Sequence, residues 1–302
     1  MSRYRFHTLD VFTDVPFGGN PLAVVLDADG LSSERMQTIA GEFNLSETVF
    51  VLNPQKAGGN RRKVRIFTPQ AELPFAGHPT VGTSYLLARL KLFELDPAHP
   101  VMVLEEGIGD VPVNVRFAGD DPEFTQMSVP RMPERGPEPP SRTDLAAMLS
   151  LSEPDLLPGH AAWSCGVPFL FIPVRDREAI ARAKLRTDLW EKLLSGWWAR
   201  SIFPFTTDTV SKAAQIHARM FAPAMGVAED PATGSAASAL AGYLHALEQR
   251  DGRRRWLIEQ GFEMGRPSLI ELEADIEGGR IAAVRVGGSS VLVSDGWIDA
   301  GG

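Results

Sequence analysis

The sequence predicts a mixed α+β protein built from two similar halves. Three observations support this prediction. Short motifs recur in one order about 150 residues apart, apolar runs of strand length occur in both halves, and each half has a glycine turn that starts a helix of small residues. At 302 residues, the chain is long enough for two domains that each bury a core.

The internal repeat consists of four motif pairs. The pairs are 19–25 with 166–172, 65–69 with 219–223, 76–80 with 233–237, and 104–107 with 258–261. Common strand and turn motifs could produce one such match by chance, but four in the same order, separated only by short insertions, indicate an internal repeat. The two halves should therefore share one architecture.

Apolar runs and alternation define the strands expected in the first half. They lie near residues 6–12, 22–26, 48–52, 63–67, 101–104 and 111–117. A surface helix is expected over 32–43, because Ser32 can accept hydrogen bonds from the first-turn amides and Glu34 lies at the positive end of the helix dipole.

The second half should begin with helices of its own, over 143–151 and 189–199. Three tryptophans are expected on one apolar face of the later helix, namely Trp190, Trp197 and Trp198. The proline-rich stretch 130–140 is typical of a linker between the halves.

Two strands near the end of the chain, over 280–286 and 290–293, have no counterpart in the first half. The terminal segment should therefore cross back to complete the first domain. The predicted domains are 1–125 with 283–302, and 126–282.

The composition argues against several classes of function. A net charge of -8 indicates a soluble globular protein, and the one basic cluster, 253–255, lies beside Asp251 and Glu259, so no nucleic-acid partner is expected. No segment approaches the roughly 20 apolar residues of a membrane span, and the N-terminus lacks a signal-peptide core, so we expect no membrane partner and a cytoplasmic protein.

Metal sites and disulfides are also disfavoured. Cys165 is the single cysteine, which leaves no internal disulfide and no cysteine-based zinc site. The six histidines include no pair spaced to place two ligands on one helical face. Because Cys165 has no evident base partner, we interpret it as a packed, inert thiol.

Glu47 is the first candidate for chemistry. It lies where a predicted helix and loop give way to the strand near 48–52, a junction at which scaffolds commonly present a working side chain. From this motif alone, a capping or solvated surface carboxylate remains an open interpretation.

Two glycine turns are the second feature that points to a site. Pro79, just after Gly77 and His78, falls where the first helical turn tolerates a missing N–H, and Gly234 and Ser235 start the matching helix. Helix N-termini carry unpaired N–H groups and a partial positive charge, so two of them facing one cleft would bind a carboxylate. Alternatively, both turns simply start core helices.

Together, these motifs predict a site that gathers Glu47, His78, Asp230 and Ser235, a set able to donate, accept and orient protons. His78 by itself could also be a core histidine. A Ser-His-Asp hydrolase is disfavoured because the chain lacks a G-x-S-x-G motif and Ser235 lies in a helix-entry turn.

Longer motifs along nearly the whole chain resemble those of a known family. They are Asp10-Val11-Phe12, Gly19-Asn20-Pro21, Ser46-Glu47-Thr48, Phe75-Ala76-Gly77-His78-Pro79-Thr80, Glu229-Asp230-Pro231-Ala232-Thr233-Gly234-Ser235-Ala236 and Gly265-Arg266-Pro267-Ser268. The chain resembles the PhzF-like isomerases of phenazine biosynthesis, which belong to the same fold superfamily as diaminopimelate epimerase and proline racemase.

The resemblance implies two pseudo-symmetric domains, each a mixed, strand-built open barrel around a central helix, with the site in the cleft between them. It also implies a homodimer, a small carboxylate substrate, no cofactor, and proton transfer on an unsaturated acid similar to that of dihydro-hydroxyanthranilate isomerase. The implied catalytic residues are Glu47, His78 and Asp230, with Glu47 as the acid/base. The implied substrate-binding residues are Asn20, Ser46, Gly77, Gly234 and Ser235.

Two alternatives to a proton-shifting isomerase stay open. The first is an epimerase or racemase of an amino acid-like substrate. The related enzymes use one cysteine from each half, whereas Ala76 and Asp230 lie near those positions here, so a one-glutamate proton transfer fits better. The second alternative is a protein that binds a small acid without turning it over.

Overall fold

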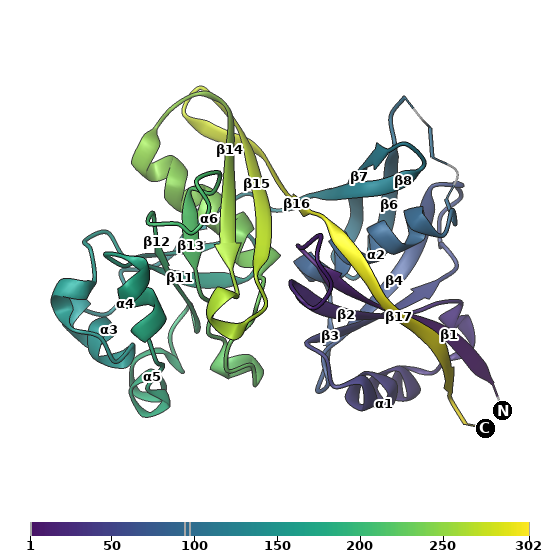
Figure 1. The fold of residues 1–302 in the computed structure, drawn as a ribbon, viewed down its shortest axis with the longest axis horizontal. Coiled ribbons are helices and arrows are strands. Elements are labelled where there is room, and N and C mark those ends of the chain that lie inside the picture. Colours follow the sequence, from purple (N-terminus) through teal and green to yellow (C-terminus); the bar gives the residue numbers. More distant parts are fainter. Residues whose placement is uncertain (1, 94, 97, 302) are drawn as a thin grey trace. The chain divides into compact units, whose positions relative to one another are not determined.

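The computed structural model describes residues 2–93, 95–96 and 98–301. The chain divides into two compact units, residues 1–128 with 287–302 (unit 1) and residues 129–286 (unit 2). Both units consist mainly of strands with few helices, which confirms the α+β prediction (Figure 1). In the described part of the chain, every helix is too short or too polar to cross a membrane.

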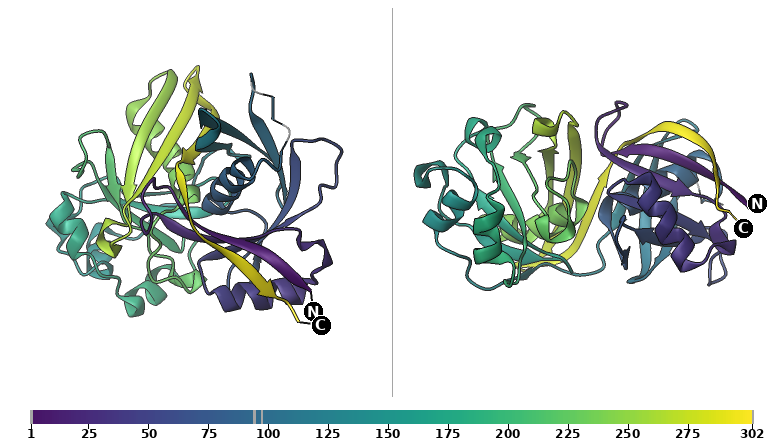
Figure 2. Two further views of the ribbon diagram at one scale, coloured as in Figure 1. Left: turned by 45° about the vertical axis from the view of Figure 1, so that its right-hand side comes forward. Right: turned by 90° about the horizontal axis from the view of Figure 1, so that it is seen from below.

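Unit 1 contains most of the strands expected from the first half of the sequence. Its strands are β1 (Arg3–Val11), β2 (Asn20–Val25), β3 (Glu47–Leu52), β4 (Arg61–Phe67), β5 (Glu72–Leu73), β6 (Val101–Glu106), β7 (Gly109–Ala118), β8 (Asp121–Ser128) and β17 (Ser290–Asp299). Its helices are α1 (Ser33–Phe43) and α2 (Gly77–Arg89). The end of the chain pairs with its beginning, because β17 runs antiparallel to β1, side by side along its length (Figure 2).

The strands of unit 1 surround α2. Strand pairing is antiparallel for β1–β2, parallel for β2–β3, antiparallel for β3–β4, parallel for β4–β6 and antiparallel for β6–β7. Helix α2 contacts β1, β2, β3, β6, β7, β8 and β17, and every residue from Gly77 to Ser84 is buried. The helix is thus apolar or small on all sides, as a central helix must be.

Helix α1 packs against β3 and β4. Ser32 caps it as predicted, because its hydroxyl accepts a hydrogen bond from the Arg35 amide at 3.2 Å. The helix ends at Asn44, whose left-handed φ of 50° turns the chain towards β3. Ile39 of the helix packs with Phe50 of β3 in one apolar cluster.

Unit 2 carries more helix than unit 1 and encloses a second central helix. Its strands are β9 (Glu134–Arg135), β10 (Ala161–Ser164), β11 (Pro168–Pro173), β12 (Ser201–Thr206), β13 (Ile216–Ala218), β14 (Gly252–Gln260) and β15 (Ser268–Glu277), and β16 (Arg280–Gly288) leads back to unit 1. Its helices are α3 (Arg142–Met148), α4 (Arg177–Arg182), α5 (Thr187–Leu194) and α6 (Gly234–Glu248).

The order of strand pairing in unit 2 repeats that of unit 1. From β10 through β14 to β15, successive pairs are antiparallel, parallel, antiparallel, parallel and antiparallel. Helix α6 is buried from Ala236 to Leu244 and contacts β9, β10, β11 and β15. Helices α2 and α6 begin at Gly77 and Gly234, as predicted. The pseudo-symmetric architecture is therefore confirmed.

Two predictions about the second half are wrong. The stretch 130–140 is not a bare linker, since β9 within it pairs with β10 and Gly136 packs directly against the ring of Trp198. Helix α5 ends at Leu194, so Trp197 and Trp198 follow the helix and pack, half-buried, against the core of unit 2. The low helix propensity of the glycine after Ser195 explains the early end.

Replacing Gly82 in α2 by alanine should destabilise the protein. An alanine Cβ at this position would lie 2.5 Å from Val11 Cγ2 and 2.8 Å from Leu22 Cδ2, and such overpacking costs about 1–3 kcal/mol of unfolding free energy. In the control Gly41→Ala of α1, the nearest atom is the Pro69 carbonyl oxygen at 3.9 Å, so helix propensity should stabilise by about 0.5–1 kcal/mol. Denaturant unfolding measures both variants, and effects of the same sign would contradict the packing of α2.

Candidate active site

Glu47 is held at the start of β3. Helix α1 ends at Asn44, and Glu47 lies opposite Leu22 of the parallel strand β2. Ser46, the residue before it, is half-buried, and Glu47 is 9% exposed. The carboxyl group is therefore neither a helix cap nor a solvated surface charge.

His78 approaches the same carboxyl group from the first turn of α2. It is 5% exposed, and its Nε2 lies 3.3 Å from Oε2 of Glu47. The structure thus brings together two predicted site residues that come from a strand and a helix of unit 1.

The protonation of His78 follows from its surroundings. Burial lowers the pKa of His78 to about 3, against the smaller opposing effect of a hydrogen bond to the Pro21 backbone. Because proline has no backbone N–H, the neutral ring must donate to the Pro21 carbonyl. Its other nitrogen, Nε2, is then an acceptor that faces Glu47. A hydrogen bond between the two side chains forms when Glu47 carries the proton.

Asn20 is the first residue of β2 and directly precedes Pro21, whose carbonyl oxygen accepts the hydrogen bond from His78. It is fully buried opposite Val11 of β1. The turn before it requires glycine, because Gly19 has a φ of 60° and a Cβ there would lie 2.3 Å from the Val11 carbonyl oxygen. The bond between Pro21 and His78 joins this segment to the first turn of α2. The predicted site residues of unit 1 therefore form one cluster.

The first turns of α2 and α6 both lack a side-chain cap. Ala76, the N-cap residue of α2, has no hydrogen-bonding side chain, and Thr233, the N-cap residue of α6, donates its hydroxyl proton to Oδ2 of Asp230 at 2.5 Å. Uncapped amides at a helix start favour anions. Both helix starts therefore keep the ability to bind a carboxylate.

The predicted residues of unit 2 lie around the start of α6. Asp230 is 8% exposed, and its amide donates to the Met220 carbonyl at 3.0 Å. Its own carbonyl accepts a hydrogen bond of 2.8 Å from the Gln260 side chain. Gly234 is the first residue of α6, and the half-buried Ser235 is the second. Asp230 is therefore held through its main chain and its side chain.

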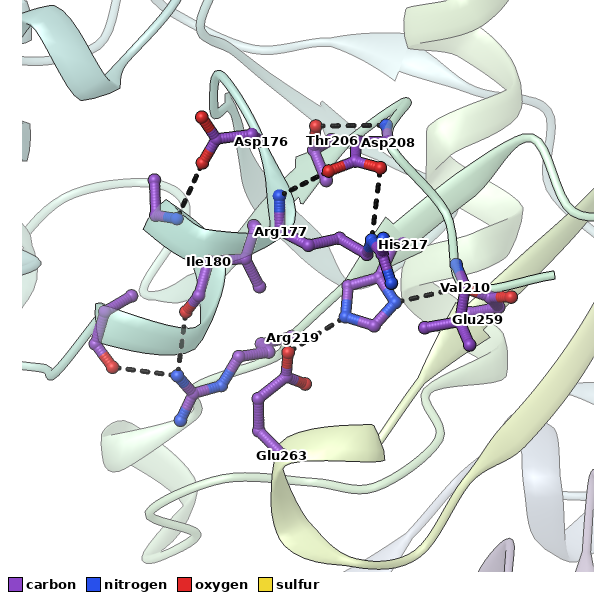
Figure 3. A network of polar contacts seen from close by, with 12 residues as sticks. Asp176, Arg177, Ile180, Thr206, Asp208, Val210, His217, Arg219, Glu259 and Glu263 are labelled. Atoms are coloured by element: carbon purple, nitrogen blue, oxygen red, sulfur yellow. Dashed lines mark hydrogen bonds and ion pairs between the residues drawn. The ribbon is translucent and has the colours of Figure 1, made fainter. Parts of the chain in front are cut away.

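Sequence reasoning missed the ion pair that anchors this loop. Glu229, directly before Asp230, accepts two hydrogen bonds of 2.7 Å from Arg219. Arg219 is 9% exposed and also donates to the carbonyl groups of Ile180 and Ala183, at 3.0 and 2.8 Å (Figure 3). The Arg219 guanidinium therefore ties the loop before α6 to the carbonyl groups at the end of α4.

The internal repeat contained the signal for this ion pair. Arg65 occupies the position of Arg219 in the matching motif, and it binds Glu72 through two hydrogen bonds of 2.7 and 2.6 Å. An arginine retained at both positions of the repeat, next to a buried strand, predicts a matching partner in each unit.

His217 lies between two carboxylates in the same region of unit 2 (Figure 3). Its Nδ1 is 3.0 Å from Glu259 Oε2, and its Nε2 is 2.9 Å from Glu263 Oε1. Burial lowers the pKa of His217, but the hydrogen bonds with Glu263 and Glu259 outweigh it and raise the pKa. A carboxylate on each nitrogen stabilises the doubly protonated ring.

Cys165 is free and 6% exposed. Burial, helped by the charge of Glu134, raises the pKa of its thiol to about 12, so the thiolate needed for reaction is scarce. Among the residues that the structure describes, no three or more His, Cys, Asp or Glu side chains are grouped as metal ligands.

Comparison with solved structures assigns the class of protein. A phenazine biosynthesis protein of the PhzF family from Bacillus anthracis aligns with a TM-score of 0.88 at 28% sequence identity, covering 99% of this chain and 99% of that one. Together with proline racemase-like structures, it shows that the chain has a diaminopimelate epimerase-like fold.

Comparison with known sequences assigns the family. The family model described as phenazine biosynthesis-like protein matches residues 9–296. An uncharacterized isomerase of Mesorhizobium japonicum is 43% identical over 303 residues, covering 98% of this chain and 99% of that protein. The trans-2,3-dihydro-3-hydroxyanthranilate isomerase of Pseudomonas aeruginosa is 36% identical over 295 residues, covering 97% and 98%. The chain belongs to the phenazine biosynthesis-like, or PhzF, family of isomerases.

A His217→Gln variant should lose more stability below about pH 6.5 than at alkaline pH. Folding raises the pKa of His217 above its ordinary value of 6.5, so the charged ring stabilises the protein fully below that pH, and this contribution disappears as the pH rises through the folded-state pKa. The difference in unfolding free energy between parent and variant should therefore shrink as the pH rises above about 6.5 in denaturant titrations. A pH-independent difference would contradict the imidazolium form.

A Cys165→Ala variant should keep the parent's turnover, because burial keeps the thiol protonated. Thiol-blocking reagents should accordingly leave both proteins equally active. Complete loss of activity in a variant with an unchanged circular dichroism spectrum would instead support a thiol mechanism.

Proposed function

We propose that this chain catalyses cofactor-independent proton transfer on a small unsaturated carboxylic acid, with Glu47 as the acid/base. The observation that carries the proposal is the buried pair in unit 1, in which Glu47 Oε2 lies 3.3 Å from Nε2 of a neutral His78. A carboxyl group removed from water and facing a neutral acceptor is suited both to take up and to release a proton.

In the proposed reaction, ionised Glu47 removes a proton from one carbon of the substrate. The electron pair of the broken C–H bond shifts the adjacent double bond, and the protonated Glu47 returns a proton to a second carbon. Substrate and product therefore have the same atoms and the same oxidation state. Between the two steps, His78 accepts a hydrogen bond from the carboxyl group through Nε2 and keeps it oriented.

The uncapped start of α2 supports a carboxylate substrate. Its amides, beginning at Gly77, follow an N-cap residue without a hydrogen-bonding side chain and can bind an anion. The Pseudomonas aeruginosa relative is named for an acid of this class, trans-2,3-dihydro-3-hydroxyanthranilate. We propose this compound as the first substrate to test.

Further binding roles are proposed for residues in both units. They are Asn20, Ser46 and Gly77 in unit 1, and Asp230, Gly234 and Ser235 in unit 2. The anchoring of the Asp230 loop supports a positioning task, because side-chain and main-chain bonds restrict it before any ligand arrives. Homodimer formation and a cytoplasmic location stay predictions.

The single cysteine argues against the two-thiol route of an epimerase or racemase. Cys165 is the only thiol in the sequence, and burial keeps it protonated. A binding protein without turnover would differ from the proposed enzyme in one measurable respect, since only the enzyme would exchange substrate hydrogens with solvent.

Glu47→Gln should abolish turnover while binding survives. Glutamine keeps the size of the side chain but cannot take up a proton, so the rate should fall by roughly 10²- to 10⁴-fold. The measurement is deuterium incorporation from heavy water into trans-2,3-dihydro-3-hydroxyanthranilate, followed by NMR, with ligand affinity measured by calorimetry. Turnover within a few-fold of the parent would remove Glu47 from the mechanism.

A control variant and variants of the proposed binding residues separate chemistry from binding. Glu42→Gln changes an exposed glutamate of α1 and should leave turnover unchanged. Asp230→Ala or Ser235→Ala should weaken ligand affinity as well as rate, because groups that orient the substrate act in the ground state and the transition state.

A further inference from the structure

Another buried carboxyl group of unit 1 lies within hydrogen-bond distance of the first turn of α2. Glu106 is the last residue of β6 and is 9% exposed. Its Oε1 lies 2.6 Å from the Thr80 hydroxyl, and its Oε2 is buried without a hydrogen-bond partner among the described residues. The group also borders a pocket of about 500 Å³, at whose rim Glu72 lies.

The proton count on Thr80 determines the state of Glu106. The Thr80 hydroxyl lies 2.7 Å from the Ala76 carbonyl oxygen, which can only accept. A hydroxyl has a single proton, so when that proton goes to Ala76, the carboxyl of Glu106 must be the donor to Thr80. Both contacts can be hydrogen bonds at the same time only if the chain runs from Glu106 through Thr80 to Ala76, with a neutral carboxylic acid at its start.

The electrostatic surroundings of Glu106 also favour its neutral, protonated form. Burial raises the pKa of Glu106 to about 8, whereas a proton donated by the Thr80 hydroxyl would stabilise the ionised carboxylate and oppose that rise in part. The titratable groups on the elements around it are Glu105 on β6, Arg61, Arg62, Lys63 and Arg65 on β4, Glu72 on β5, Asp110 and Arg116 on β7, and Tyr85, Arg89 and the neutral His78 on α2. The cations Arg61 and Arg65 are paired with Glu105 and Glu72, so neither is committed to Glu106.

The hydrogen-bond chain reaches the proposed anion site through one peptide bond. The Ala76 carbonyl and the Gly77 N–H belong to the same planar peptide and point in opposite directions. Holding the carbonyl along the helix axis, where it also accepts the Thr80 amide at 3.3 Å, therefore points the Gly77 N–H out of the helix start.

The matching position in unit 2 performs a comparable task with an amide. Gln260 ends β14 as Glu106 ends β6. Its Nε2 donates to the Asp230 carbonyl at 2.8 Å and the Thr233 hydroxyl at 3.0 Å, and its Oε1 accepts from the Thr233 amide at 3.1 Å. In both units, the residue that ends this strand binds the turn at the start of the central helix.

We propose that Glu106 is a positioning residue that, as a neutral hydrogen-bond donor, holds the first turn of α2 in the geometry that binds the substrate carboxylate. It acts through Thr80 and Ala76 and does not touch the substrate. The inference rests on the proposed function, because it concerns the amides that would bind the acid. Ionisation of Glu106 would turn the Thr80 proton towards the new carboxylate and leave the Ala76 carbonyl with only the hydrogen bond of 3.3 Å from the Thr80 amide.

Glu106→Gln tests the inference, with trans-2,3-dihydro-3-hydroxyanthranilate as substrate. In the parent, KM should rise as the pH passes the Glu106 pKa of about 8, by up to about tenfold per pH unit, while kcat changes little because the amides bind ground and transition states alike. Glutamine is a donor at every pH, as Gln260 is, and should abolish this rise. Glu42→Gln removes an exposed carboxylate of α1 and leaves the ion pairs of Arg61 and Arg65 intact, so this variant should retain the rise in KM.

Infrared difference spectroscopy tests the neutral acid without turnover. The parent minus Glu106→Gln spectrum at neutral pH should contain the carbonyl band of one protonated carboxylic acid, which disappears at alkaline pH. If Glu106→Gln does not fold, Thr80→Val should raise KM at neutral pH, and Thr80→Ser, which restores the hydroxyl, should return it to the parent value.

Any one of three results would overturn the inference. The first is a pH-dependent rise in KM that persists unchanged in Glu106→Gln. The others are a missing acid band in the difference spectrum and a Thr80→Val variant with the parent's KM. If the parent turns over no substrate, the proposed function fails separately. The affinity of each variant for anthranilate, measured by calorimetry across the same pH range, then replaces KM and decides the role of Glu106.

Discussion

The structure of unit 1 depends on one constraint, a helix buried at the centre of a strand-built barrel. Such a helix begins with amides that lack intrahelical partners, and burial makes each of them costly unless a partner or ligand satisfies it. Helix α2 meets this constraint with Gly77 after an uncapped Ala76, and Thr80 and Glu106 tie the first turn from within. We propose that the amides that point outward bind the substrate carboxylate.

The repeat preserves the polar scaffold that surrounds each central helix. Glu105 accepts two successive loop amides in unit 1, at 2.7 and 3.1 Å, and Glu259 does the same in unit 2, at 2.9 and 2.6 Å. Charge-assisted bonds of this kind are strong because the carboxylate is removed from water. The two units differ at the next residue, where Glu106 and Gln260 reach the helix start with different chemistry. The two units therefore share this framework and differ in single side chains.

Glu47 and Glu106, two buried carboxyl groups of unit 1, face different hydrogen-bond partners. These partners suit the two groups to different tasks. Glu47 faces the acceptor nitrogen of a neutral imidazole, an arrangement suited to moving a proton. Glu106 faces a hydroxyl that also lies within hydrogen-bond distance of a carbonyl oxygen, an arrangement that we propose holds a proton on the carboxyl group. Neither arrangement needs a metal ligand or a bound cation to explain it. The contrast follows the general rule that environment separates the roles of similar acids in one site.

The sequence by itself determined the repeat, the helix starts at Gly77 and Gly234, and the family, because motif order and helix entry depend on neighbouring residues. It also named Glu47 and His78, but it could not place them 3.3 Å apart or give the tautomer of the ring. Only the tertiary structure decided those points, the pairing within the supposed linker, and the role we propose for Glu106. These features depend on strand register and side-chain packing between distant segments, which local propensity does not encode.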